Sequence, residues 1–280
     1  MSHWPIIHGP SYSVGLSTIT TSRGTAITAS GTANTKGTWS QIIASTADDY
    51  QALIISLKGA TIGPGRGILD IGIGASTAEQ VLIPDLRWGQ GSSVIRTFAH
   101  AYFCPIGIAT GTRVSGRAAA SVASMVCHVQ IIGIPRSMQY DPNFDQVNHY
   151  GIVTADSGGT GADCGATANT KGAWAILTSS TTEPIKMFYV IMISANTGTP
   201  AAGGDGVVDI GIGATGSEQI IIPDLPWCWA TDASAVMSKP VVAGPFYCDI
   251  PSGTQIQARS AGSGTDATGR VIDVSVLAFV

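Results

Sequence analysis

Two aspartates, Asp70 and Asp209, stand at the same place in two near-identical stretches, LDIGIGA and VDIGIGA. A carboxylate can act as a general acid or base, but that chemistry needs a second acid or base at a fixed distance. The sequence locates no such partner. Arg117 and Arg259 recur at matching positions, so we expect structural ion pairs, Asp70 with Arg117 and Asp209 with Arg259, or bonds from the aspartates to turn backbone. No catalytic residue is predicted.

Three glycines in the second stretch match a cofactor motif. Gly211, Gly213 and Gly216 fit the GxGxxG pattern of dinucleotide-binding proteins letter by letter. In that motif a helix follows the glycines and binds the pyrophosphate with its N-terminus. Here SEQIIIPDL follows, which is typical of a strand ended by proline, and the first copy has Thr77 at the third glycine position. We therefore predict no cofactor.

A packing role accounts better for the glycines on these two strands, since two glycines on one strand face leave a flat surface that a ring or another backbone can approach closely. We expect Trp39 and Trp174, or a neighbouring subunit, to cover them. The candidate packing glycines are Gly72, Gly74, Gly211 and Gly213.

Two further tryptophans, Trp88 and Trp227, follow a PDL turn in both stretches. An exposed tryptophan can stack on a sugar, but an anchor in a core or interface is the more frequent role. We therefore name both as candidate packing or interface residues and leave glycan binding open.

The duplicated acids also raise the question of a metal. Glu79 with Asp85, and Glu218 with Asp224, flank a strand in each copy, and carboxylates suit calcium. Solvated strand ends are the favoured interpretation, because Asp and Glu are rarely buried. The five histidines are isolated, and no CxxC, HExxH or GxSxG occurs. We predict no metal and no enzyme. The odd set of five cysteines indicates buried free thiols rather than disulfides.

The elements that position these residues belong to a repeat. ANTKGTW, which begins at Ala33, returns as ANTKGAW 135 residues later, and the offset between matching residues grows along the chain to 145 at the last strand. The order of the matches never changes. This pattern indicates one duplicated domain whose second copy has longer loops, since surface loops tolerate insertions.

Each copy has the pattern of strands. Apolar residues alternate with polar ones or glycines in each, and clusters of Gly, Pro, Asn and Ser separate the runs. We predict an all-β fold of two tandem antiparallel β-sandwiches, jelly-roll-like, whose strand order the sequence does not give. The expected parts are an N-terminal arm at 1–20, repeat 1 at 21–135, a linker at 136–151 and repeat 2 at 152–280. Such arms often fasten one subunit to another.

The composition excludes several classes of function. Only 11% of residues are charged and the net charge is −4, without any basic run, so nucleic-acid binding is not expected. The most apolar run, MFYVIMI at 187–193, has the length of a strand and is far shorter than the roughly 20 residues of a membrane-spanning helix. The first residues show no secretory signal. We expect no membrane association and synthesis in a reducing cytoplasm.

The duplicated string DIGIGAxxxEQxxIPDL, with IPSGTQIQAR at 250–259 and the looser IATGTRVSGR at 108–117, carries a resemblance. It is similar to β-rich structural proteins of tailed bacteriophages, of the head-decoration, head-fibre and tail types. The resemblance implies a virion component assembled in the host cytoplasm, a homo-oligomer (a trimer), and partners such as the major capsid or tail proteins. It transfers no catalytic residue.

Two functions are compatible with the sequence. The first is a non-enzymatic structural protein of a bacteriophage virion that acts through packing between subunits. The alternative is a glycan-binding adhesion or receptor-binding module, with sugar sites formed by loops and tryptophans. Binding to host glycans that is lost on changing Trp88 or Trp227 would favour the second.

Overall fold

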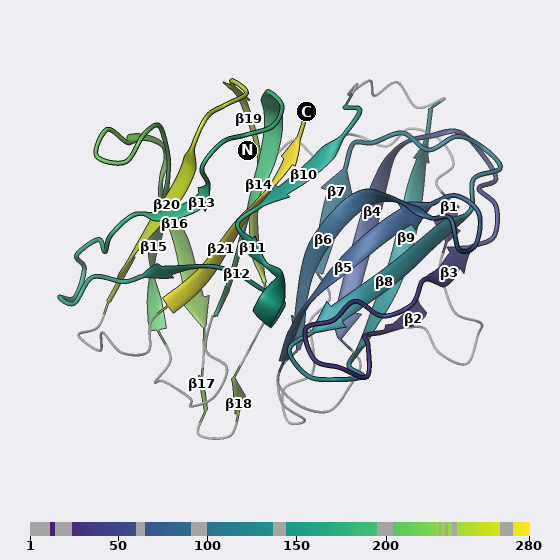
Figure 1. Ribbon diagram of the computed structural model, residues 1–280, viewed down its shortest axis with the longest axis horizontal. Helices are drawn as coiled ribbons and strands as arrows, with labels where there is room; N and C mark the ends of the chain where they lie inside the picture. Colours follow the sequence, from purple (N-terminus) through teal and green to yellow (C-terminus); the bar gives the residue numbers. More distant parts are fainter. Residues whose placement is uncertain are drawn as a thin grey trace.

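The computed structural model describes residues 12–14, 24–59, 65–90, 100–136, 144–194, 204–229, 231–232, 235–236, 240–263 and 271–280 (Figure 1). Almost all regular structure in these residues is β strand, and the sole helical turn there is the 3-10 turn η1 (Thr154–Asp156). No helix in the described part of the chain is long and apolar enough to cross a membrane.

The first sandwich consists of two antiparallel sheets. One sheet has, in spatial order, β2 (Thr25–Thr28), β9 (Val126–Pro135), β4 (Tyr50–Gly59) and β7 (His100–Cys104). The other has β3 (Ser40–Ile43), β8 (Val114–Ala120), β5 (Gly65–Ile73) and β6 (Gln80–Gln90).

The second sandwich repeats this order. Its first sheet has β12 (Gly158–Asp163), β21 (Val271–Phe279), β14 (Ile185–Ser194) and β19 (Val241–Ile250), with β11 (Ile152–Val153) beside β12. Its second sheet has β13 (Ala175–Thr178), β20 (Ile256–Gly262), β15 (Gly204–Ile212) and β16 (Gln219–Trp229). A small hairpin joins β17 (Thr231–Asp232) to β18 (Ala235–Val236).

The strand order is that of a jelly roll. In chain order the eight strands alternate between the two sheets, except that β5 and β6, like β15 and β16, form a hairpin within one sheet. Two four-stranded sheets linked in this way are the eight-stranded jelly-roll arrangement. The predicted all-β fold of two tandem sandwiches is therefore confirmed, and the structure supplies the strand order.

The two sandwiches have one more strand each. β1 (Tyr12–Val14) pairs with β9, and β10 (Val147–Tyr150) pairs with β21 in the equivalent register. The predicted linker at 136–151 thus ends as a strand of the second sandwich, because Val147 is buried beside Phe279. Residues 1–11 and 15–23, most of the predicted arm, lie outside the described residues, as do 137–143 of the linker.

The sandwiches lie side by side, with β10 of the second against β6 of the first and β12 against β5 (Figure 1). β14 is buried on both faces by this arrangement. Phe188 and Val190 point into the core of the second sandwich, whereas Met187, Tyr189 and Ile191 join the core cluster of the first. A strand covered on both sides needs apolar residues at every position, which explains the run MFYVIMI.

Candidate functional site

The duplicated aspartates lie in a polar network on the outer face of the β3–β8–β5–β6 sheet. Asp70 Oδ2 accepts a hydrogen bond from Arg117 Nε at 2.9 Å, and its Oδ1 contacts Lys36 Nζ. Lys36 also contacts Asp85, and the backbone N–H of Asp85 donates to Asp70 Oδ1 at 3.0 Å. Asp70 is 1% exposed, and its charge is matched by two partly exposed cations, Lys36 and Arg117.

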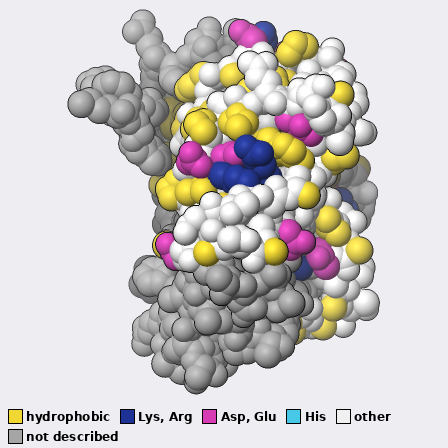
Figure 2. All heavy atoms as spheres, turned by 90° about the vertical axis from the view of Figure 1, so that its left-hand side faces the viewer, with side chains coloured by type: hydrophobic (Ala, Val, Ile, Leu, Met, Phe, Trp, Pro, Cys, Tyr) yellow, Lys and Arg dark blue, Asp and Glu magenta, His cyan; other side chains and the backbone are white. Residues whose placement is uncertain are grey.

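The second sandwich reproduces this network. Arg259 Nε donates to Asp209 Oδ2 at 2.9 Å, and Lys171 Nζ lies 2.7 Å from Asp209 Oδ1 and 2.8 Å from Asp224 Oδ1. The N–H of Asp224 donates to Asp209 Oδ1 at 2.9 Å. Each aspartate therefore contacts the arginine that the repeat predicts as its partner. Figure 2 shows a central group of basic and acidic side chains on this face, with hydrophobic side chains beside it and further charged side chains toward the edges of the view.

The network holds Asp209 ionised. Burial alone would raise the pKa of Asp209, but the hydrogen bonds from Lys171, the Asp224 backbone and Arg259 outweigh it, so the pKa lies below its usual value. In the first copy, burial raises the pKa of Asp85 against the opposing effect of Lys36. Because its pKa is lowered and three hydrogen bonds already occupy its oxygens, Asp209 is poorly suited to take up a proton as a general base.

Aromatic rings cover two of the four candidate glycines. A Cβ at Gly72 would lie 2.6 Å from the Trp39 ring, and one at Gly211 would lie 2.8 Å from the Trp174 ring. Each ring is in turn covered by the arginine of its network. The Cζ atom lies 4.5 Å from the ring centroid both for Arg117 over Trp39 and for Arg259 over Trp174. The expected tryptophan cover is therefore present at these two positions.

Gly74 and Gly213 lie directly after the last residue of β5 and β15, so they are not part of a flat strand face. Their φ angles are +112° and +105°, a conformation that side chains rarely adopt. They start the turn that leads to the next strand. The interpretation of these two glycines as a flat packing face is therefore wrong.

Trp88 and Trp227 are core residues. Trp88 is 0% exposed and stands directly across from Gly67, and Trp227 is 3% exposed across from Gly206. The indole N–H of Trp227 donates to Ser260 Oγ at 3.2 Å. At 0% and 3% exposure neither ring offers a face on which a sugar could stack, although Trp227 also borders the groove described below.

One of the duplicated acids at the strand ends is less exposed than expected. The side chain of Glu79 is 2% exposed and lies 2.7 Å from Arg113, whose hydrogen bond lowers the Glu79 pKa. The interpretation of Glu79 as a solvated strand end is therefore wrong. The Asp224 side chain is 66% exposed, as a solvated strand end should be. Within the described residues, no group of three or more His, Cys, Asp or Glu is placed to hold a metal.

The cysteines also depart in part from expectation. All five are free, and Cys104, Cys127 and Cys164 are buried, which raises the pKa of the first two thiols. Cys228 is exposed, so the expectation of buried thiols is wrong for it.

A second polar cluster joins the two sandwiches, and sequence reasoning missed it. Arg66 Nη1 donates to Asp273 Oδ2 at 2.5 Å, and Arg66 Nη2 donates to Asp156 Oδ2 at 2.8 Å. Arg87, which is 0% exposed, donates to Asp273 Oδ2 at 3.3 Å and to its backbone oxygen at 3.2 Å. Neither arginine has a counterpart in the second copy, so the repeat gave no signal for them.

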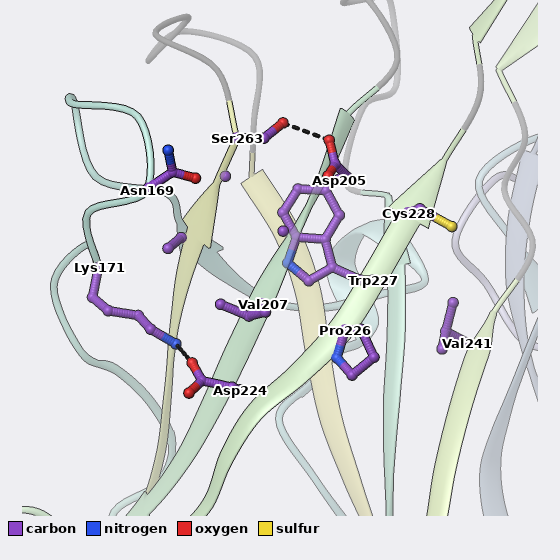
Figure 3. Close-up of a pocket in the computed structure, with 13 residues that line it drawn as sticks. Asn169, Lys171, Asp205, Val207, Asp224, Pro226, Trp227, Cys228, Val241 and Ser263 are labelled. Carbon is purple, nitrogen blue, oxygen red and sulfur yellow. Dashed lines mark hydrogen bonds and ion pairs between the residues drawn. The ribbon is translucent and has the colours of Figure 1, made fainter.

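The second sandwich carries an open groove of about 680 Å³, which is lined by residues of β15, β16 and β20, by the loop before β13 and by Val241 of β19 in the other sheet (Figure 3). Asp205 and Val207 line it from β15, and Pro226 and Cys228 line it from β16. Lys171 reaches in from the loop before β13 to meet Asp224 (Figure 3). The groove is apolar at its centre with single charges at its rim.

Comparison with known proteins does not place the chain in a family. No family model matches the sequence, and no curated protein does. Among solved structures the chain is similar to PNGF-II in two crystal forms, at 8% and 9% identity and TM-scores of 0.41 and 0.43, covering 93% of this chain and 66% of that one. The chain thus spans about two thirds of the PNGF-II chain.

A further similarity is to the insecticidal delta-endotoxin Cry8Ea1 from Bacillus thuringiensis. Identity is 11% and the TM-score 0.24, covering 85% of this chain and 54% of that one. Similarities this weak carry no conclusion about function.

Proposed function

We propose that the chain is a non-enzymatic structural protein of a bacteriophage virion that acts through the packing of one sandwich on another. The observation that carries this proposal is that the duplicated polar residues form ion pairs with one another. Asp70 and Asp209, the best candidates for chemistry, are each bound by an arginine of the neighbouring strand and by a lysine of a loop. What the two copies share is a scaffold.

The contact between the sandwiches supports the same proposal. It combines a buried polar centre, Arg66 and Arg87 with Asp273, with an apolar surround that includes Tyr189 and Phe279. Separating the two sandwiches would leave these buried charges without their partners, so the contact favours a fixed arrangement of the two. The resemblance of the DIGIGAxxxEQxxIPDL string to phage structural proteins is the reason for naming a virion.

The test is quantitative mass spectrometry of particles purified from the source. We expect the chain in many copies per particle, and the copy number would separate a head component from a tail component. Absence from particles, with the chain recovered free or on a cell surface, would overturn the proposal.

The alternative, a glycan-binding module, has one feature in its favour. The groove on the second sandwich offers Asp205, Asn169 and Lys171 around an apolar centre, which suits a polar ligand with apolar faces. A glycan array probed with the full chain, beside an Asp205→Ala variant, tests it. Binding that the variant loses would favour the module.

A further inference from the structure

A hairpin of the second sandwich is seated on two arginines of the first. It consists of β11, η1 and the start of β12, whose strands pair with each other. Its Asp156 accepts a hydrogen bond from Arg66 Nη2 at 2.8 Å. A Cβ at Gly158 would lie 3.0 Å from Arg66 Cζ, and a Cβ at Gly159 would overlap Arg87 Nη1. An acidic turn with small residues therefore fits closely on the two arginines.

The groove on the second sandwich contains the same positions of the repeat. Arg66 pairs with Gly89 across β5 and β6, and Asp205 pairs with Cys228 across β15 and β16 in the equivalent register. Asp205 and Cys228 both line the groove (Figure 3). The place that holds a hairpin in the first sandwich is thus an open groove in the second.

Burial follows this difference. Arg66 and Ile68 are buried under the hairpin side of the second sandwich. Their counterparts two strands into the second copy are accessible, since Asp205 is exposed and Val207 is half-buried. The same positions of the sheet are therefore covered in one copy and uncovered in the other.

The floor of the groove is apolar and restricts how an occupant docks. Val207 pairs with Ala261 on one side and with Pro226 on the other, so these side chains lie in one row across the sheet. The edge strand β16 carries Pro223 and Pro226, and a proline lacks the N–H that pairing with a further strand uses. We therefore expect an occupant to lie across the sheet, as the hairpin does, and not to extend it.

The two bases that hold the hairpin are replaced in the groove. Asp205 stands in the place of Arg66, and Pro226 stands in the place of Arg87. An acidic turn like the one at Asp156 would meet a carboxylate here in place of a guanidinium. Like charges in contact oppose association, whereas a base would be attracted. The groove therefore suits a hairpin of the opposite charge.

The Asp205 carboxylate is placed to receive such a base. The residue is exposed and accepts a hydrogen bond from Ser263 Oγ at 2.5 Å. Within the part of the chain that the structure describes, Asp205 forms no ion pair. Lys171, the one cation among the described lining residues, is already bound to Asp209 and Asp224.

We propose that the groove binds a hairpin turn of another protein of the particle, with a lysine or arginine beside Asp205 and small residues over Val207 and Pro226. This inference rests on the proposed structural function and names the chemistry of the partner. The first sandwich holds an acidic hairpin with basic side chains, and the second holds a basic hairpin with an acidic one. The repeated site thus serves once within the chain and once between chains.

A cyclic peptide tests the site on the full chain. Residues 151–160 form the hairpin, and their ends meet because the N–H of Thr160 donates to the Gly151 oxygen at 2.6 Å. The segment can therefore be closed head to tail. The probe is this cyclic peptide with Asp156→Arg, and the unchanged peptide is its control. We expect calorimetry to show the probe binding at least roughly tenfold more tightly, because only the probe brings an opposite charge to Asp205.

Variants of the chain locate the binding. Asp205→Arg is expected to weaken the probe by roughly tenfold or more and to improve binding of the unchanged, acidic peptide. Asp205→Asn, which adds no charge, should weaken the probe less. Asp249→Arg is the matched control, since the Asp249 side chain is 83% exposed and lies outside the groove, and it leaves binding unchanged. Circular dichroism verifies the fold of each variant.

Cys228 supplies a second readout, because it is exposed and pairs with Asp205 across the groove. Maleimide labelling of Cys228 is expected to fall when the probe is bound and in purified particles. Labelling of the half-buried Cys248, outside the groove, is the internal control.

The outcomes separate this docking from the proposed function. If the probe binds no better than the unchanged peptide, or binds equally to the D205R variant, the docking is wrong. If the chain is abundant in particles but Cys228 reacts there as it does in the free chain, the docking is wrong and the structural function stands. If the chain is absent from particles but the probe binds and protects Cys228, the virion function fails and the basic-hairpin site stands.

Two further results would replace the partner. Self-association of the chain in light scattering that is lost with D205R overturns the docking in favour of a second copy. A glycan that binds the groove and is lost with D205R, without any preference for the basic probe, overturns it in favour of a ligand site.

Discussion

Arg87 of the first sandwich and Asp273 of the second form an ion pair at 3.3 Å in which neither side chain is more than 4% exposed. Arg66 contacts the same carboxylate oxygen at 2.5 Å, and Asp156 neutralises the other side of Arg66. Two cations thus share two acids, so charge is balanced within the interface. Burial lowers the pKa of Arg87 while Asp273 opposes that shift. An arginine does not lose its proton in proteins, so the balance depends on the acid.

Asp273→Ala is expected to destabilise the chain strongly. It leaves two buried arginines without their shared acid, and removing one partner of a buried pair costs about 3–5 kcal/mol. Urea unfolding of the full chain measures the loss. Asp249→Ala is the matched control, because the Asp249 pair with Lys186 is exposed and exposed pairs contribute about 0–1 kcal/mol. Equal, small effects of the two variants would contradict the role given to Asp273.

The interface is also expected to weaken in acid through His149. Its Nε2 lies 3.0 Å from Ser275 Oγ and its Nδ1 3.4 Å from the Pro84 oxygen. Burial, and then the nearby charge of Arg87, lower the pKa of His149 to about 3, from an ordinary value of 6.5. The unfolded chain therefore binds a proton between these values that the folded chain does not. The contribution of His149 to the free energy of unfolding is therefore complete above pH 6.5 and falls as the pH decreases toward 3.

The measurement is the unfolding free energy at pH 7 and pH 5. Wild type is expected to lose about 2 kcal/mol from this group over that range, since each pH unit below 6.5 contributes about 1.4 kcal/mol. His149→Gln removes that part of the pH dependence, and His128→Gln, on the outer face of the first sandwich, keeps it. An unchanged pH dependence in H149Q would show that the His149 ring is solvated.

The duplicated networks predict unequal effects of two neighbouring acids. Asp209→Asn removes the buried charge that binds both Lys171 and Arg259 and is expected to cost about 1–3 kcal/mol. Asp224→Asn changes a side chain that is 66% exposed and is expected to cost at most about 0.5 kcal/mol. Because the pKa of Asp209 is lowered, its stabilisation is present above its ordinary pKa of 3.8 and is lost as the pH falls below it. Equal losses in both variants at pH 7 would contradict this division.

Much of the architecture could be predicted from the repeat and from alternation. A pattern with period two marks a strand and its faces, and two copies of it mark two sandwiches. The pairs of Asp70 with Arg117 and of Asp209 with Arg259 could be named because all four residues recur. Lys36 and Lys171 recur as well, but they stand in a turn motif, and their approach to the acids depends on the strand order.

The contact between sandwiches could not be predicted, because it breaks the repeat. Arg66 and Arg87 match Asp205 and Pro226 in the other copy, so comparison of the copies hides them. The run MFYVIMI predicts a single strand, but what covers its second face depends on how the copies pack. Gly74 and Gly213 could not be placed correctly, because the sequence does not show where a strand ends and a turn with positive φ begins.

Gly206 is expected to tolerate no side chain, because a backbone oxygen and a tryptophan ring fill the space that a Cβ would occupy. A Cβ there would overlap the backbone oxygen of Ala261 and lie 2.5 Å from the Trp227 ring. The backbone oxygen belongs to the paired strand and cannot turn aside, so Gly206→Ala has to move β15 away from β20. We expect a loss of about 3 kcal/mol or more in unfolding free energy. Gly216→Ala is the control: its Cβ would meet nothing within 4 Å, and its φ of +85° makes the expected cost about 1–2 kcal/mol from backbone strain alone. A smaller loss for G206A than for G216A would show that β15 and β20 separate easily at this point.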